Sequence, residues 1–188
     1  MKFYRILYCL INNSYKKISQ RDISKYSSCT PAYVCKVIKR LIQKKIVVKI
    51  NKNRIIVQNP LMLAYLLSYS RRFPHPLMFR TTNYKDALAV LKKTTYSITL
   101  DSAGKKKPEK IWAYVLGKDV NYIIDSFNQV WTHPDLIIFP ADIFRFRKQK
   151  IVNNVYTVSD WDLVIDYLTV GNNYMAVNLL KKYKLCEL

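Results

Sequence analysis

The sequence is poor in the residues on which many catalytic and metal sites depend. It has only three glycines, and none forms a phosphate-binding loop or a G-x-S-x-G elbow. Two histidines, His75 and His133, and four cysteines without a C-x-x-C pair argue against a zinc site. No run of 18 apolar residues exists, and the N-terminal stretch lacks the pattern of a cleaved leader. We therefore expect a cytoplasmic chain with no cofactor, no membrane partner and no enzymatic activity.

The four cysteines are most simply interpreted as free thiols. Cys9, Cys29, Cys35 and Cys186 show no disulfide framework, and buried thiols are common in a reducing cytosol. Cys29 with Cys35 is a weak disulfide candidate.

Acidic residues are nearly absent from the first part of the chain. Residues 1–80 contain 17 lysines and arginines against one acid, Asp22, a net charge of +16. Residues 81–188 contain 15 against 11, a net charge of +4. Like charges at the first density repel one another in a folded protein, so a polyanionic partner is expected. The pattern favours nucleic acid, with an anionic membrane surface second and a merely solvated lysine-rich face as the plain alternative.

Helical spacing and capping signals predict three helices before residue 46. Apolar residues recur at helical intervals over 3–11, and Ser19 with Asp22 forms a capping-box start for a short second helix. Thr30 is expected to cap a third helix that has Pro31 at its first position and runs to about residue 45.

Two β-branched runs then predict a hairpin. They cover 46–50 and 54–58 and are separated by Asn51, Lys52 and Asn53, a composition suited to a tight turn. Three helices followed by a hairpin are the order of a winged helix-turn-helix domain, which we assign to residues 1–72. Such a domain lays one helix in the major groove of DNA, and its hairpin reaches the adjacent backbone.

The third predicted helix has an apolar side and a basic side, so the DNA-contacting residues can be named. Those near its start are expected to read bases, and the other basic residues of the helix and hairpin are expected to contact phosphates. The candidate DNA-binding residues are Thr30, Ala32, Tyr33, Lys36, Lys39, Arg40, Lys49, Lys52 and Arg54. The alternatives are that the same surface docks a protein, that Lys52 and Arg54 are simply exposed to solvent, and that Tyr33 packs on the second helix.

The rest of the chain predicts an α/β domain. An apolar helix at about 61–71 is a candidate homodimer face, with packing inside the protein as the equal alternative. A proline-containing linker is placed at 73–82. Alternating helical and strand patterns over 83–188 predict a small α/β domain with a mixed sheet, for partner binding or dimerisation. The fold class is therefore α+β, and 101–110 is expected to be a basic loop between strands.

Two acidic clusters are candidate catalytic sites. Asp160 and Asp162 form a D-x-D pair of the kind that holds magnesium, but the pair lies at a predicted helix start, where capping by Ser159 and Asp162 explains it better. Asp101, Glu109 and Lys110 lack the spacing of a metal-dependent nuclease. A metal-dependent nuclease or nucleotidyltransferase that uses Asp101, Asp160 and Asp162 remains the alternative function.

The segments "IWAYVLGKDVNYIIDSFNQVWTHPDLIIFPAD" and "VYTVSDWDLVIDYLTVGNNYMAVNLLKKY" carry a family resemblance. Their layout resembles the C-terminal domain of the AbiEi-type antitoxins of type IV toxin-antitoxin systems. Asp166–Tyr167–Leu168 occupies the position of that family's aspartate, whereas Gly171–Asn172–Asn173 replaces its usual arginine-glycine pair. The resemblance implies an autoregulating antitoxin that binds its own promoter, and whose partner is a nucleotidyltransferase-like toxin.

The leading hypothesis is a sequence-specific transcriptional regulator that binds double-stranded DNA as a homodimer. A replication or chromatin protein that binds DNA without sequence choice is the other alternative.

Overall fold

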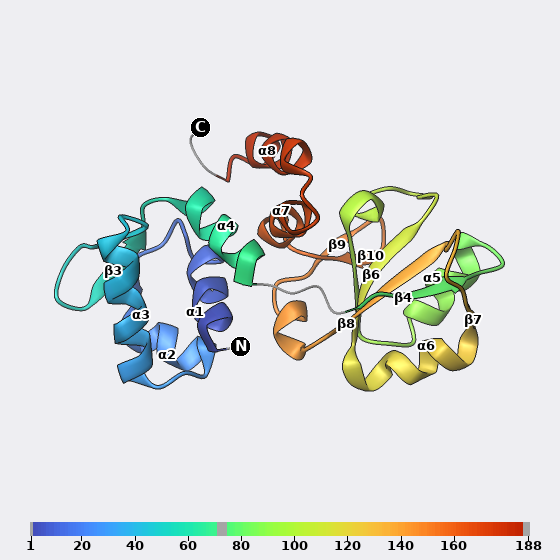
Figure 1. The fold of residues 1–188 in the computed structure, drawn as a ribbon, viewed down its shortest axis with the longest axis horizontal. Coiled ribbons are helices and arrows are strands. Elements are labelled where there is room, and N and C mark those ends of the chain that lie inside the picture. Colours follow the sequence, from blue (N-terminus) through green and yellow to red (C-terminus); the bar gives the residue numbers. More distant parts are fainter. Residues whose placement is uncertain (1, 71–74, 186–188) are drawn as a thin grey trace. The chain divides into compact units, whose positions relative to one another are not determined.

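The computed structural model describes residues 2–70 and 75–185 and shows a mixed α and β structure (Figure 1). The chain divides into two compact units. One consists of Met1–Arg72 with Tyr167–Leu188, and the other of Phe73–Asp166. Each unit is described separately below.

The helices of the first unit build its core. α1 contacts α2, α3 and α4, and α2 also contacts α3. Ile6, Leu7 and Leu10 of α1 are fully buried, as is Ile23 of α2. The bounds are α1 Lys2–Ile11, α2 Gln20–Ser27, α3 Pro31–Gln43, α4 Pro60–Ser70 and α8 Asn173–Lys182.

Capping signals near α2 and α3 behave differently. The Ser19 hydroxyl accepts a bond of 3.0 Å from the Asp22 amide and donates to the Asp22 carboxylate, which confirms the expected start of α2. Ser28, which has a φ of 53°, is the C-cap that follows α2. Thr30 occupies the N-cap position of α3, but its side chain makes no capping bond. Thr30 therefore holds the expected N-cap position, where its carbonyl accepts from the Val34 amide, but its hydroxyl contributes no capping bond.

A small antiparallel sheet completes this unit. Its strands are β1 Ile18–Ser19, β2 Val47–Lys49 and β3 Arg54–Val57, in the order β1-β3-β2. The predicted hairpin is confirmed, and Val47 of β2 pairs with Val57 of β3. Its turn is closed by the Asn51 side-chain oxygen, which accepts from the amides of Asn53 at 3.1 Å and Arg54 at 2.9 Å.

The apolar helix α4 is partly used within the unit. Leu63, Ala64 and Leu67 are buried, and α4 contacts α1. Met62 and Tyr69 on other sides of the helix are 47% and 86% exposed. Packing inside the protein thus accounts for one side of α4.

The second unit contains a mixed seven-stranded sheet. Its strand order is β7-β4-β8-β6-β5-β10-β9, with β6 parallel to β8, β5 parallel to β10, and the other pairs antiparallel. The bounds are β4 Leu77–Arg80, β5 Tyr96–Thr99, β6 Ile111–Leu116, β7 Asn128–Gln129, β8 Leu136–Ala141, β9 Lys150–Val152 and β10 Val155–Thr157.

The two faces of this sheet have different roles. Alternate residues of β6 point to opposite faces, so Ile111, Ala113 and Val115 join a hydrophobic core with α5 (Tyr84–Leu91) and α6 (Val120–Ser126). Trp112 and Tyr114 lie on the other face, where the Tyr114 hydroxyl donates to Asp166 of α7 (Asp160–Thr169) at 3.0 Å. Short 3₁₀ helices cover Leu100–Ser102, Gly117–Asp119 and Ile143–Phe146.

Two expected boundaries differ from the structure. The segment 73–82, expected to be a linker, contains β4, which pairs with both β7 and β8; positions 71–74 lie outside the described residues. The proline at 76 immediately precedes the strand, a position where its missing amide costs no ladder bond. The second domain, expected to span 83–188, differs at its C-terminal boundary, because the residues after Asp166 group with the first unit.

Candidate nucleic-acid interface

The helix α3 is anchored by an apolar stripe. Val34, Val37, Ile38 and Leu41 are at most 3% exposed, at the three- and four-residue spacing that places side chains on one side of a helix. Their burial fixes the rotation of α3 about its axis. The remaining side of the helix is consequently determined as well.

That remaining side is basic and faces solvent. Ala32, Lys36 and Lys39 are separated by four and three residues, so they form one row, and all three are exposed. Arg40 lies beside this row and is exposed, whereas Tyr33 is half-buried. Gln43 continues the row by four residues and is exposed. Thr30, directly before the helix, is exposed too.

The hairpin carries the other candidate residues. Lys49 lies in β2 opposite Ile55, Arg54 begins β3, and Lys52 lies in the turn between the strands. All three side chains are exposed. The three residues thus lie on the hairpin, at the positions that the sequence predicts.

The charges of this surface are not neutralised within the protein. Among residues 2–70 and 75–185, no ion pair involves Lys36, Lys39, Arg40 or the three basic hairpin residues. No acidic residue occurs between Asp22 and Asp86, so the sequence offers few partners. Like charges three or four residues apart on a helix cost about 0.2–0.5 kcal/mol per pair. An external polyanion would remove this cost.

The second unit contains a buried ion cluster of a different kind. The Arg145 guanidinium donates to both carboxylate oxygens of Asp166, at 2.6 Å each, and also pairs with Asp162. Thr99 donates to Asp166 as well, and the Arg145 guanidinium lies 4.1 Å from the centre of the Tyr114 ring. The three charged side chains are at most 4% exposed. These bonds make the cluster a structural tie between α7 and the sheet.

Asp160 and Asp162, two of the three acids of the alternative catalytic site, both bond to neighbouring side chains. Asp162 accepts from the Ser159 hydroxyl at 2.7 Å and from Arg145, and its amide bonds back to Ser159 at 3.1 Å, as a capping box requires. Asp160 pairs with Lys150. Within the described part of the chain, no group of three His, Cys, Asp or Glu side chains is placed to hold a metal ion.

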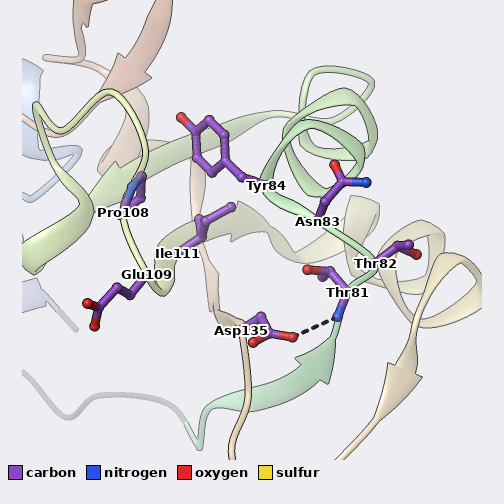
Figure 2. Close-up of a pocket in the computed structure, with 8 residues that line it drawn as sticks. All are labelled: Thr81, Thr82, Asn83, Tyr84, Pro108, Glu109, Ile111 and Asp135. Atoms are coloured by element: carbon purple, nitrogen blue, oxygen red, sulfur yellow. Dashed lines mark hydrogen bonds between the residues drawn. The ribbon is translucent and has the colours of Figure 1, made fainter.

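A cavity of about 200 Å³ lies in the same unit (Figure 2). Thr81, Thr82, Asn83 and Tyr84 line it from one segment, and Figure 2 shows Asp135 bonded to the Thr81 amide, at 3.2 Å. Partial burial raises the pKa of the Tyr84 hydroxyl above its ordinary value.

No disulfide joins the cysteines that the structure describes. Cys9, Cys29 and Cys35 form no disulfide, so the weak Cys29–Cys35 candidate is wrong; Cys186 lies outside the described residues.

None of the helices in the described part of the chain has the length and apolar character needed to span a membrane. Comparison of the sequence with protein-family models and with curated proteins gives no match.

Proposed function

We propose that residues 1–72 form a winged helix-turn-helix domain that binds double-stranded DNA, with α3 in the major groove and the β2–β3 hairpin on the adjacent backbone. The observation that carries this proposal is the exposed, unneutralised basic row of α3, opposite its buried apolar stripe. The order α1, α2, α3 and then a hairpin supports it, because this arrangement presents a helix and a β-finger together.

The energetic argument rests on counterion release. Lysine and arginine side chains that displace cations condensed on DNA gain free energy, and each neutralised phosphate contributes about −0.9 to the slope of log affinity against log salt. The five exposed basic residues of α3 and the hairpin other than Lys36 would then give a slope of about −4.5 if each meets one phosphate. Contacts from the start of α3, at Ala32, Tyr33 and Lys36, are the ones proposed to read bases.

We infer a sequence-specific transcriptional regulator without catalytic activity that acts in the cytoplasm. Its particular role as an autoregulating antitoxin with a nucleotidyltransferase-like toxin partner rests only on the layout resemblance described above. A homodimer is part of the same proposal, with the exposed Met62 and Tyr69 of α4 as candidate contacts.

Selection of bound fragments from a random duplex pool tests the specific function. The expected result is enrichment of one motif by the native chain and loss of that enrichment by Ala32→Glu, which places a negative charge among the proposed base contacts. Lys92→Ala, an exposed lysine of the second unit, is the control and should select the same motif. Uniform recovery of all sequences would instead assign the chain to the non-specific DNA-binding class.

A further inference from the structure

A larger cavity lies in the second unit, at the loop that joins β5 to β6. Its volume is about 480 Å³, within the range of about 300–1,000 Å³ that is usual for small-molecule sites. Lys105, Lys107 and Lys110 line it from the loop, and Trp112 lines it from β6. The carboxylates of Asp101 and Glu109 complete the polar part of its wall.

The loop that carries these lysines is fixed at several points. The Ser102 hydroxyl donates to the Thr99 carbonyl at 2.7 Å and accepts from the Trp112 amide at 3.0 Å. The Asn153 side chain donates to the carbonyl of Gly104, whose φ of +82° provides the turn. Pro108 is buried. The backbone of the loop that carries the lysines is therefore fixed near both ends, which reduces the entropy lost by the loop on binding.

Trp112 supplies a flat apolar surface beside the cations. Its ring stacks on Phe139, with centroids 6.0 Å apart and an angle of 16° between the planes. The Trp112 side chain is only half-buried by this packing, so part of it remains to line the cavity. Lysine ammonium groups bind phosphate oxygens, an indole stacks on a nucleobase, and carboxylates accept hydrogen bonds from base amino groups.

We propose that this cavity binds a free nucleoside triphosphate, with its phosphates on Lys105 and Lys107 and its base against Trp112. One aromatic ring in one cavity fits a single nucleotide, whereas grooves for single strands present successive rings to successive bases. The site shares no residue with α3 or the hairpin, so this inference is independent of the proposed DNA binding.

Calorimetric titration of the full chain with ATP and with GTP, in magnesium buffer, is the test. Saturable binding of one nucleotide per chain is expected for at least one of them, with adenosine, guanosine and inorganic triphosphate each at least tenfold weaker. Lys105→Glu with Lys107→Glu should weaken binding at least tenfold. Trp112→Leu should weaken it roughly fivefold or more, from the loss of base stacking. Lys92→Glu with Lys93→Glu, an exposed pair in the same unit, should change it less than twofold.

The lysine variants keep the test decisive if Trp112→Leu fails to fold, because both lysines are exposed. Absence of saturable binding by either nucleotide would overturn the proposal. Equal affinity for inorganic triphosphate would overturn the role of the base, and equal weakening by the control pair would show only general charge attraction. A single-stranded oligonucleotide, tested in a Lys36→Ala, Lys39→Ala background, should bind no tighter than the nucleotide. Tenfold tighter binding that Lys105→Glu abolishes would assign the site to a strand instead.

Discussion

Replacement of Arg145 by methionine should destabilise the second unit strongly. The variant keeps an apolar stem but leaves two buried carboxylates without their cation, since Asp162 and Asp166 are 1% and 0% exposed. Removing one partner of such a buried pair costs about 3–5 kcal/mol, because the remaining charge stays desolvated. Thr99 and Tyr114 still donate to Asp166, so we expect a value within this range rather than above it.

Lys150→Met is the matched control. Lys150 pairs with Asp160, in the first turn of the same α7, but the two side chains are 36% and 32% exposed. Solvent screens such a pair, and its loss should cost no more than about 1 kcal/mol. Each variant thus removes one cation that pairs with an aspartate of α7, and the two pairs differ mainly in burial.

Urea unfolding followed by tryptophan fluorescence measures both variants. All three tryptophans, Trp112, Trp131 and Trp161, lie in the unit Phe73–Asp166, so the signal reports this unit alone. With an m-value of about 2 kcal/mol/M, Arg145→Met should lower the midpoint by about 1.5–2.5 M. Lys150→Met should lower it by about 0.5 M or less. Equal shifts for the two variants would refute the assignment of Arg145 as a buried structural tie.

Further predictions concern the helix caps, the core and the absence of catalysis. Ser19→Ala should lower the free energy of unfolding, measured by circular dichroism, by about 1 kcal/mol, because the Asp22 amide loses its acceptor. Thr30→Ala should lower it by less, since the Thr30 side chain makes no capping bond. Leu67→Ala in the buried side of α4 should cost about 2–5 kcal/mol in thermal or urea unfolding, and an unchanged midpoint would contradict its burial. Plasmid DNA incubated with magnesium or manganese should stay intact, and cleavage that Asp162→Asn abolishes would reverse the non-enzymatic proposal.

Short-range signals in the sequence predicted much of the structure. The capping boxes at Ser19 and Ser159 depend on residues three positions apart, and both are present. The rotation of α3 follows from helical periodicity, which is why the exposure of Lys36 and Lys39 could be anticipated. These features need no knowledge of distant contacts.

The missed features are short or depend on distant partners. β9 and β10 have three residues each, and the turn between them, where Asn153 and Asn154 both have positive φ, was the available signal. Arg145 and Asp166 are 21 positions apart in the sequence, and Thr99 and Asp166 are 67 apart. No local sequence pattern therefore predicts the cluster. The β4 strand was obscured by its neighbouring prolines.

The most direct measurement of the central claim is the salt dependence of DNA affinity. Fluorescence anisotropy with a labelled duplex, over about 50 to 200 mM salt, gives the slope of log affinity against log salt. We predict a steep slope that becomes shallower by about one for Lys39→Ala and by about one for Arg40→Ala, with Lys92→Ala unchanged. An affinity indifferent to salt, or slopes that Lys92→Ala reduces as much as the α3 variants do, would contradict DNA binding through α3.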